Sequence, residues 1–186
     1  MAQHFKLHKP HNYISQFVYE KKRHKMKLGE LYPFPEGTMA IGRLDEDSEG
    51  LLLLTTDGLI SEKIRSSKFD KEYYAQVDGV ITDEAIEKLK NGVEIGFKGT
   101  KYLTKNCEAV KLTGQPDWLG AGKRIRDERH GQTSWVSITL REGKFRQARK
   151  MTAAVGFPTL RLVRVRIGPY YLNGLKPGEV EELIEL

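Results

Sequence analysis

The chain has 186 residues, of which 39% are hydrophobic and 30% charged, as is typical of a globular protein with one domain or two small ones. The longest aliphatic run, Leu51–Leu54, is far shorter than the roughly 20 residues that cross a bilayer, and the N-terminus has no signal-peptide pattern. The single cysteine, Cys107, cannot form an intramolecular disulfide, which fits a reducing compartment. Membrane, collagenous, disordered and disulfide-scaffold classes are therefore excluded, and we expect a cytoplasmic protein.

The charge is unevenly distributed along the chain. The formal net charge is +6, but residues 123–166 hold 12 basic and three acidic side chains, a local net charge of +9. Residues 179–186 hold four glutamates and no basic residue. This asymmetry favours a face that binds a polyanion, with a solvated basic surface as the alternative. A second basic cluster, residues 21–27, fits a solvated loop or a loop that contacts phosphate.

Hydrophobic periodicity and turn residues predict short elements with short connections. In chain order we expect a strand at His4–His8, a loop at Leu31–Gly37, a strand at Leu51–Thr56, a helix from Asp57–Gly58, a strand at Tyr73–Val80, a helix from Thr82 to Gly92, a strand at Ser134–Leu140, a helix at Phe145–Val155 and a strand at Leu160–Ile167. The connection at Gly114–Thr133 is long, shows no periodicity and carries the basic pair Lys123 and Arg124. Strands outnumber helices, which predicts a mixed α+β fold.

Two predicted helices have a clear hydrophobic side. In the helix after Gly58, we expect Leu59, Ile60 and Ile64 to point inward. In the helix at 145–155, the core spacing comprises Phe145, Ala148, Thr152 and Val155, and the other side holds Arg146, Arg149 and Lys150. Three neighbouring cations repel one another, so a phosphate backbone or one buried carboxylate should offset that cost.

The last strand alternates basic and aliphatic residues. Val163 and Val165 should share a core face, whereas Arg164 and Arg166 share the other face. Arg161 is out of step with that pair, which predicts that the strand starts after it. We expect all three arginines to contact phosphate or to line a positive cleft.

An acidic segment, Gly42–Gly50, contains the candidate catalytic carboxylates Asp45, Asp47 and Glu49. Its spacing is similar to the start of an EF-hand loop, but Thr56 stands where that loop needs a glutamate, which argues against calcium. Alternating carboxylates can share one side of an extended chain, so a glycoside-hydrolase pair stays open beside a solvated acidic loop. The histidines have no metal-ligand spacing, and we expect no metal.

Three blocks in order resemble the RsuA-type pseudouridine synthases. The first is Gly42–Asp45 followed by Ser48–Thr55, the second is Lys71–Tyr74, and the third is Glu142–Met151. The segments Ile125–Arg129, Ser134–Trp135 and Gly156–Leu162 are more similar to the RluE-like branch, which modifies 23S ribosomal RNA. The resemblance extends from Lys9–Pro10 to Gly168 and implies a pseudouridine synthase fold, in which a mainly antiparallel sheet is flanked by helices and two subdomains surround a cleft.

The resemblance also implies roles for individual residues. Asp45 would be the nucleophile that lets the N-glycosidic bond of a uridine break before the base rotates and rejoins through carbon. Tyr73 would stack on the uracil near the proton that leaves C5, Arg149 would pair with Asp45, and Arg43 would help to hold the flipped nucleotide. RNA contacts are expected from Arg43, Arg146, Lys150, Arg161, Arg164, Arg166, Lys123 and Arg124.

Several expectations concern the whole protein. We expect residues 1–186 to form one catalytic domain without the S4 RNA-binding domain of many relatives. The expected partner is 23S ribosomal RNA or a large-subunit precursor, bound by a monomer without a cofactor and without a membrane. Two other functions stay open: a non-catalytic ribosome-assembly factor that binds this RNA, and a sugar hydrolase that uses Asp45 with Asp47 or Glu49. A pure RNA binder has no need of a carboxylate among cations, because that carboxylate repels phosphate.

Overall fold

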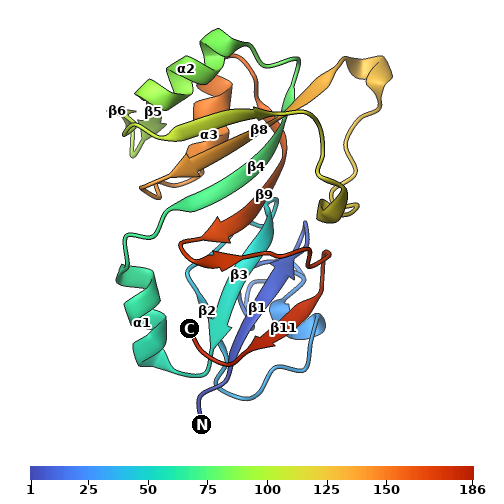
Figure 1. The fold of residues 1–186 in the computed structure, drawn as a ribbon. Helices are drawn as coiled ribbons and strands as arrows, with labels where there is room; N and C mark the ends of the chain where they lie inside the picture. Colours follow the sequence, from blue (N-terminus) through green and yellow to red (C-terminus); the bar gives the residue numbers. More distant parts are fainter. The chain divides into compact units, whose positions relative to one another are not determined.

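The computed structural model describes residues 1–186, which form two compact units (Figure 1). The terminal unit comprises Met1–Ser67, Asp117–Lys123 and Tyr171–Leu186, and the central unit comprises Lys68–Pro116 and Arg124–Tyr170. None of the helices is both long and apolar enough to cross a membrane.

The terminal unit is built on four antiparallel strands. In spatial order they are β11 (Val180–Leu183), β1 (His4–Lys9), β3 (Glu49–Thr55) and β2 (Met39–Ile41). The two predicted strands, at 4–8 and 51–56, are thus confirmed within one or two residues. Every residue of β1 and β3 is buried, so both faces of these strands are covered and not only the face that alternation marks. Short helical turns lie at Leu28–Glu30 and Asp117–Leu119.

The helix α1 (Gly58–Ser66) begins where the sequence predicts. The Asp57 carboxylate accepts hydrogen bonds from the backbone N–H groups of Leu59 and Ile60, which caps the first turn. Ile64 is buried as expected. The prediction that Leu59 points inward is wrong, because its side chain is 83% exposed. The two residues are five positions apart in the chain, which puts them about 140° apart around the helix.

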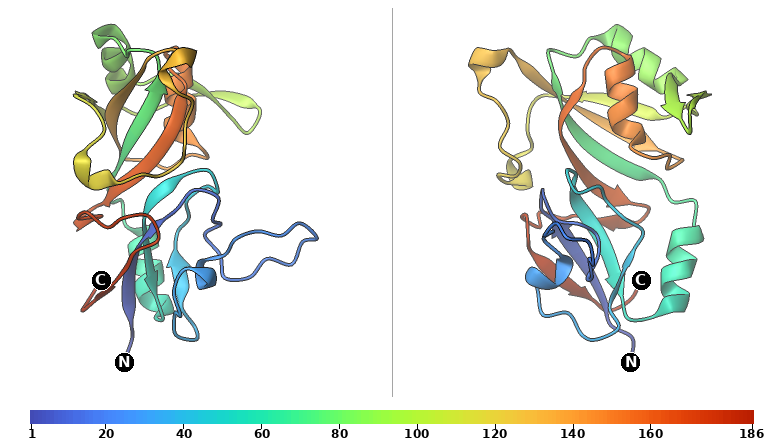
Figure 2. Two further views of the ribbon diagram at one scale, coloured as in Figure 1. Left: turned by 90° about the vertical axis from the view of Figure 1, so that its right-hand side faces the viewer. Right: turned by 180° about the vertical axis from the view of Figure 1, so that it is seen from behind.

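Four antiparallel strands form the sheet of the central unit. Their order is β9 (Thr159–Ile167), β4 (Lys71–Asp78), β8 (Thr133–Leu140) and β7 (Glu108–Leu112), and β10 (Tyr170–Tyr171) follows β9 along the chain. The helices α2 (Asp83–Asn91) and α3 (Gln147–Ala154) lie on one face of it (Figures 1 and 2). A separate hairpin pairs β5 (Glu94–Phe97) with β6 (Thr100–Leu103). The core contains Ala75 and Val77 of β4, Val136 and Ile138 of β8, and Ile86, Leu89, Ala148 and Met151 of the two helices.

The predicted ends of α2 are confirmed. The Thr82 hydroxyl accepts a hydrogen bond from the backbone N–H of Ala85, and Gly92 ends the helix with a φ of 94°. An added Cβ at Gly92 would lie 2.3 Å from the carbonyl oxygen of Thr104. Glycine is therefore needed here both for its backbone conformation and for space.

Irregular pairing along β9 changes the predicted faces. The register shifts twice against β4, so that Arg161 pairs with Gln76, Arg164 with Tyr73 and Arg166 with Glu72. Because a bulge adds one residue to a strand, side chains on its two sides exchange faces. The prediction that Arg164 and Arg166 share a face is therefore wrong. Arg164 lies on the face of Tyr73 and Ala75, whereas Arg166 lies on the face of Glu72. The strand also starts at Thr159, before Arg161 and not after it.

The helix α3 starts two residues later than predicted. Arg146 has a φ of 53°, in the left-handed region, so the helical spacing does not extend back to Phe145. Ala148 and Thr152 are buried as expected. The prediction that Phe145 belongs to the core is wrong, because its side chain is 63% exposed. The long connection at 114–133 also has local order, with helical turns at Asp117–Leu119 and Glu128–His130.

Candidate functional site

Asp45 lies in a tight turn of the terminal unit. The Ser15 hydroxyl bonds both backbone groups of Leu44, accepting from its N–H and donating to its carbonyl, each at 2.9 Å. The backbone N–H of Ser48 donates to the carbonyl of Asp45 at 3.0 Å and closes the turn. Leu44 is buried and Asp45 is half-buried. The turn thus fixes the backbone on both sides of a carboxylate that stays near the surface.

A buried lysine, Lys9, bonds the backbone of this acidic segment. Lys9 ends β1, and its ammonium group donates to the carbonyls of Pro10 at 2.9 Å, Tyr13 at 2.6 Å and Glu46 at 3.5 Å. Burial lowers the pKa of Lys9 to about 8, although the four carboxylates of Asp45, Glu46, Asp47 and Glu49 all act to raise it. The lysine therefore connects the end of β1 and the residues after it to Glu46, the residue that follows Asp45.

The neighbouring carboxylates have other partners. The Glu46 side chain pairs with Lys25, and the buried Glu49 accepts a hydrogen bond from the backbone N–H of Lys123 at 3.3 Å. Glu49 thus holds the 117–123 segment within the terminal unit and is fully shielded from solvent. No group of three or more His, Cys, Asp or Glu side chains is arranged to hold a metal ion.

Tyr73 lies in the sheet of the central unit beside two basic residues. It is opposite Ile138 of β8 and Arg164 of β9, and its ring packs against the core. Arg164 is only 4% exposed. Burial and the charge of Arg164 lower the pKa of Lys71, which lies two residues before Tyr73. The structure therefore brings Tyr73 and Arg164 together within a positively charged part of the sheet.

The first turn of α3 carries the other predicted central-unit residues. Arg149 and Lys150 are half-buried, and the Lys150 ammonium group donates to the carbonyl of Gly96 at 2.8 Å. Arg146 precedes the helix in its left-handed conformation. Arg149 thus belongs to the central unit, whereas Asp45 belongs to the terminal unit, and their pairing stays a prediction.

The remaining predicted RNA-binding residues differ in exposure. Arg43 and Arg124 are exposed and Lys123 is half-buried. Arg161 is buried, lies 5.8 Å from the Trp135 ring and donates to the Gln115 amide oxygen at 3.4 Å. Arg166 pairs with Glu72 at 3.1 Å and also donates to the carbonyl of Gly168. Arg161 and Arg166 therefore both make contacts within the central unit, and their contact with RNA stays a prediction.

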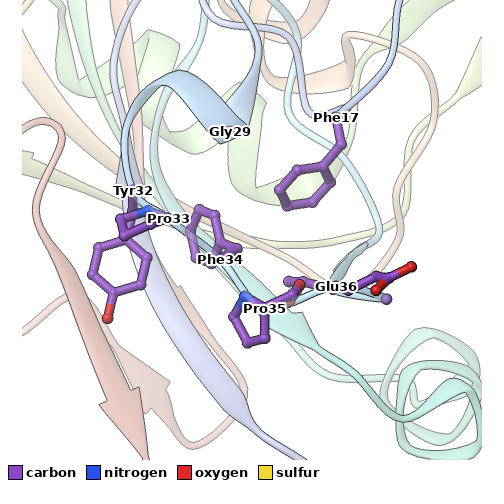
Figure 3. Close-up of a pocket in the computed structure, with 9 residues that line it drawn as sticks. Phe17, Gly29, Tyr32, Pro33, Phe34, Pro35 and Glu36 are labelled. Atoms are coloured by element: carbon purple, nitrogen blue, oxygen red, sulfur yellow. The ribbon is translucent and has the colours of Figure 1, made fainter.

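The other basic cluster and the hollow of the terminal unit lie close together in the chain. Backbone bonds from Ile14 to Met26 and from Leu28 to Gln16 close a loop that projects from the unit and carries the basic cluster at 21–27 (Figure 2). A hollow of about 300 Å³ is lined by the aromatic residues Phe17, Tyr32 and Phe34 and by residues of the loop after them (Figure 3). The ring of Phe34 contacts those of Phe5, Phe17 and Tyr32, so this hollow is the surface of a packed aromatic cluster. None of the predicted site residues lines it.

The sequence did not single out Ser15 as a functional residue. Lys9 stood out only as part of a Lys-Pro pair, and the role of its ammonium group depends on carbonyls that folding brings together. Ser15 gave no signal, because its partner Leu44 lies 29 residues away.

Comparison with known proteins identifies the family. Residues 3–154 match the family described as RNA pseudouridylate synthase, and the chain belongs to this family. A solved structure titled "Crystal structure of pseudouridylate synthase" superposes on 98% of this chain and 70% of its own, with a TM-score of 0.74 and 26% sequence identity. The fold expectation, a mixed and mainly antiparallel sheet with helices, is thus confirmed.

Relatives place the chain within the family. It is 40% identical over 177 residues, 94% of this chain and 72% of the relative, to "Ribosomal large subunit pseudouridine synthase E" of Vibrio vulnificus (strain CMCP6). It is 37% identical to the protein of the same name from Xanthomonas axonopodis pv. citri (strain 306), covering 92% of this chain and 88% of the relative. The resemblance to the RsuA type and its RluE-like branch is confirmed, and the protein is a pseudouridine synthase.

Proposed function

We propose that this enzyme converts one specific uridine of 23S ribosomal RNA, free or in a large-subunit precursor, to pseudouridine. The observation that carries this proposal is the identity with synthases of large-subunit RNA along more than nine-tenths of the chain. The net charge of +9 within residues 123–166 supports a polyanionic substrate. We further propose that residues 1–186 work as one catalytic domain, as a monomer in the cytoplasm and without a cofactor.

The reaction is an isomerisation, so it needs no atom from outside the nucleotide. The bond between N1 of uracil and C1′ of ribose breaks, and a bond between C5 and C1′ forms. One proton leaves C5 and one proton is taken up at N1, so protons balance as well. The enzyme must therefore supply a nucleophile, a hold on the detached base and a route for one proton.

We assign the nucleophile to Asp45. A carboxylate acts as a nucleophile only when it is ionised, and exclusion of water around a substrate would disfavour its charge. The turn held by Ser15 orients the backbone at Asp45, and the Lys9 ammonium group bonds the carbonyl of the next residue, Glu46. We infer from the family motif that Arg149 supplies a further opposite charge to Asp45 in the working enzyme.

We assign the hold on the base to Tyr73 and the hold on the flipped nucleotide to Arg43. Removing a uridine from its stack costs a few kcal/mol, and stacking on an aromatic ring recovers about 1–3 kcal/mol for each base. Tyr73 is fixed between two neighbouring strands, so its ring is oriented before the substrate binds. We also propose that Arg164 and Lys71, which lie beside Tyr73 in the sheet, attract the phosphate of the same nucleotide.

The test is to incubate the protein with unmodified 23S ribosomal RNA and to map pseudouridine by carbodiimide treatment and primer extension. We expect a new stop at a single position. Analysis of the supernatant for free uracil separates isomerisation from hydrolysis, because only a hydrolase releases the base. Tight binding with no stop and no free uracil, on a pre-ribosomal particle as well as on naked RNA, would favour the assembly-factor function instead.

A further inference from the structure

A cluster of lysine and aromatic side chains lies on the surface of the central unit. We call it the lysine–aromatic patch, and it consists of Phe97, Lys98, Tyr102, Lys144, Phe145 and Lys150. Its residues come from the β5–β6 hairpin and from α3 with the loop before it, which lie side by side (Figure 1). Of these six residues, only Lys150 was expected to bind RNA.

Aromatic rings hold the three ammonium groups of the patch. The Lys144 ammonium lies 5.1 Å from the centre of the Phe97 ring and 5.0 Å from that of Tyr102. The Lys98 ammonium lies 5.3 Å from the Phe97 ring, and the Lys150 ammonium lies 5.3 Å from the Phe145 ring. A ring face attracts a cation but carries no formal negative charge that would neutralise it.

Other lysines of the same unit are paired differently. Carboxylates pair with the ammonium groups of Lys88, Lys90, Lys101 and Lys111. The lysines of the patch pair with none, although Glu142 lies two residues before Lys144 in the chain. The patch therefore concentrates three ammonium groups, none of which lies within salt-bridge distance of a carboxylate.

The loop that carries Lys144 and Phe145 is firmly anchored. The carboxylate of Glu142 accepts hydrogen bonds from the Tyr102 hydroxyl, the Lys105 backbone N–H at 2.8 Å and the Gln147 amide at 2.9 Å. Gln147 in turn accepts a bond from the backbone N–H of Lys144 at 3.0 Å. These bonds hold Phe145 in a fixed position with 63% of its surface exposed. A large aromatic side chain is thus kept in water and flanked by cations.

We propose that the lysine–aromatic patch binds an unpaired stretch of RNA that flanks the target uridine. One base stacks on Phe145, and neighbouring phosphates bind Lys98, Lys144 and Lys150. Stacking requires a base that is not already within a duplex, so the patch selects single-stranded RNA. This inference rests on the proposed RNA substrate and adds a second contact region to the residues that act on the uridine.

The first test measures the salt dependence of binding to a 12-nucleotide oligouridylate by fluorescence anisotropy. Each phosphate neutralised on single-stranded RNA contributes about 0.7 to the slope of log affinity against log salt. Affinity falls as salt rises, and in the double variant Lys98→Gln/Lys144→Gln this fall should be less steep, with a slope smaller in magnitude by about 1.4. The matched control Lys88→Gln/Lys90→Gln removes two lysines that are paired with glutamates on the same unit, and its slope should be unchanged.

The second test concerns the exposed ring. Phe145→Leu should weaken oligouridylate binding about tenfold, whereas Phe145→Trp, which keeps an aromatic face, should bind like the unmodified protein. Binding to a 12-base-pair RNA duplex should not distinguish the two variants. Because Phe145 is exposed, neither change should lower the melting temperature.

Wild-type affinity and slope in the folded Lys98→Gln/Lys144→Gln and Phe145→Leu variants would overturn the proposal, as would the absence of oligouridylate binding by the unmodified protein. Pseudouridine formation on 23S ribosomal RNA is measured separately with the unmodified protein. Binding that depends on the patch without any pseudouridine would refute the proposed function alone. Pseudouridine formation with patch variants that bind like the unmodified protein would refute the patch alone.

Discussion

At the scale of single residues, the candidate nucleophile depends on side chains that never need to touch RNA. Ser15 bonds both backbone groups of Leu44, and Lys9 bonds three carbonyls around the same segment. Precise placement matters because a misplacement of about 1 Å in an active site can reduce a rate roughly 100-fold. The acidic motif alone identifies Asp45 as a candidate, but only the folded chain shows how its backbone is held.

Cys107 gives a prediction about pH. Burial, with the charges of Glu142 and Glu108, raises the pKa of its thiol to about 11. Only the thiolate reacts, so alkylation by iodoacetamide at pH 8 should be about 100-fold slower than in the unfolded chain, and its rate should rise until about pH 11. The folded state holds the proton more tightly between pH 9 and 11, so this thiol lowers the free energy of unfolding as pH rises through that range. Equal rates in native and urea-unfolded protein would contradict the assignment.

At the scale of elements, the alternation of the last strand led to a wrong assignment of faces. The alternation itself is real, but the two register shifts against β4 depend on how β9 is paired, and the strand's own sequence has no signal for them. Where pairing is regular, as between β4 and β8, residues two apart such as Ala75 and Val77 both face the core. The predicted start of α3 is wrong for a similar reason. Phe145 fits the helical spacing of hydrophobic residues, but the left-handed backbone of Arg146 keeps it out of the helix.

The corrected face of Arg166 leads to a prediction. Arg166→Gln leaves Glu72 without its ionic partner, so the free energy of unfolding should fall by about 1–3 kcal/mol while the salt slope of RNA binding stays the same. Arg43→Gln, a change at an exposed site, should instead lower the slope by about 0.7 on single-stranded RNA and leave stability unchanged. Urea titration and anisotropy measure the two quantities. A lower slope with unchanged stability in Arg166→Gln would contradict this prediction and favour a direct contact between Arg166 and RNA.

The end of α2 gives a prediction about packing. Gly92→Ala should lower the free energy of unfolding by roughly 2–4 kcal/mol, because the backbone is left-handed and the new Cβ would clash with the Thr104 carbonyl. Gly96→Ala is the control, since nothing lies within 4 Å of its Cβ and its φ is not positive. Urea unfolding of both variants tests the comparison, and equal stabilities would count against the described junction.

At the scale of the whole molecule, the sequence was most informative where motifs carry chemistry. The three blocks around Asp45, Tyr73 and Arg149 are enough to indicate the family, and the family is confirmed along most of the chain. Composition and strand count also gave the α+β class. Contacts between residues far apart in the chain could not be predicted, because the bonds from Ser15 to Leu44 and from Tyr102 to Glu142 depend on the completed fold. The lysine–aromatic patch belongs to this second group.

The measurement that tests the account most directly compares Asp45→Asn with Glu46→Gln on unmodified 23S ribosomal RNA. Both changes remove one negative charge from the same turn, but only the first removes the proposed nucleophile. We predict that Asp45→Asn lowers pseudouridine formation by about 1,000-fold or more while RNA affinity stays within a few-fold, and that Glu46→Gln stays active. Pseudouridine formation by Asp45→Asn at the rate of the unmodified protein would contradict the account.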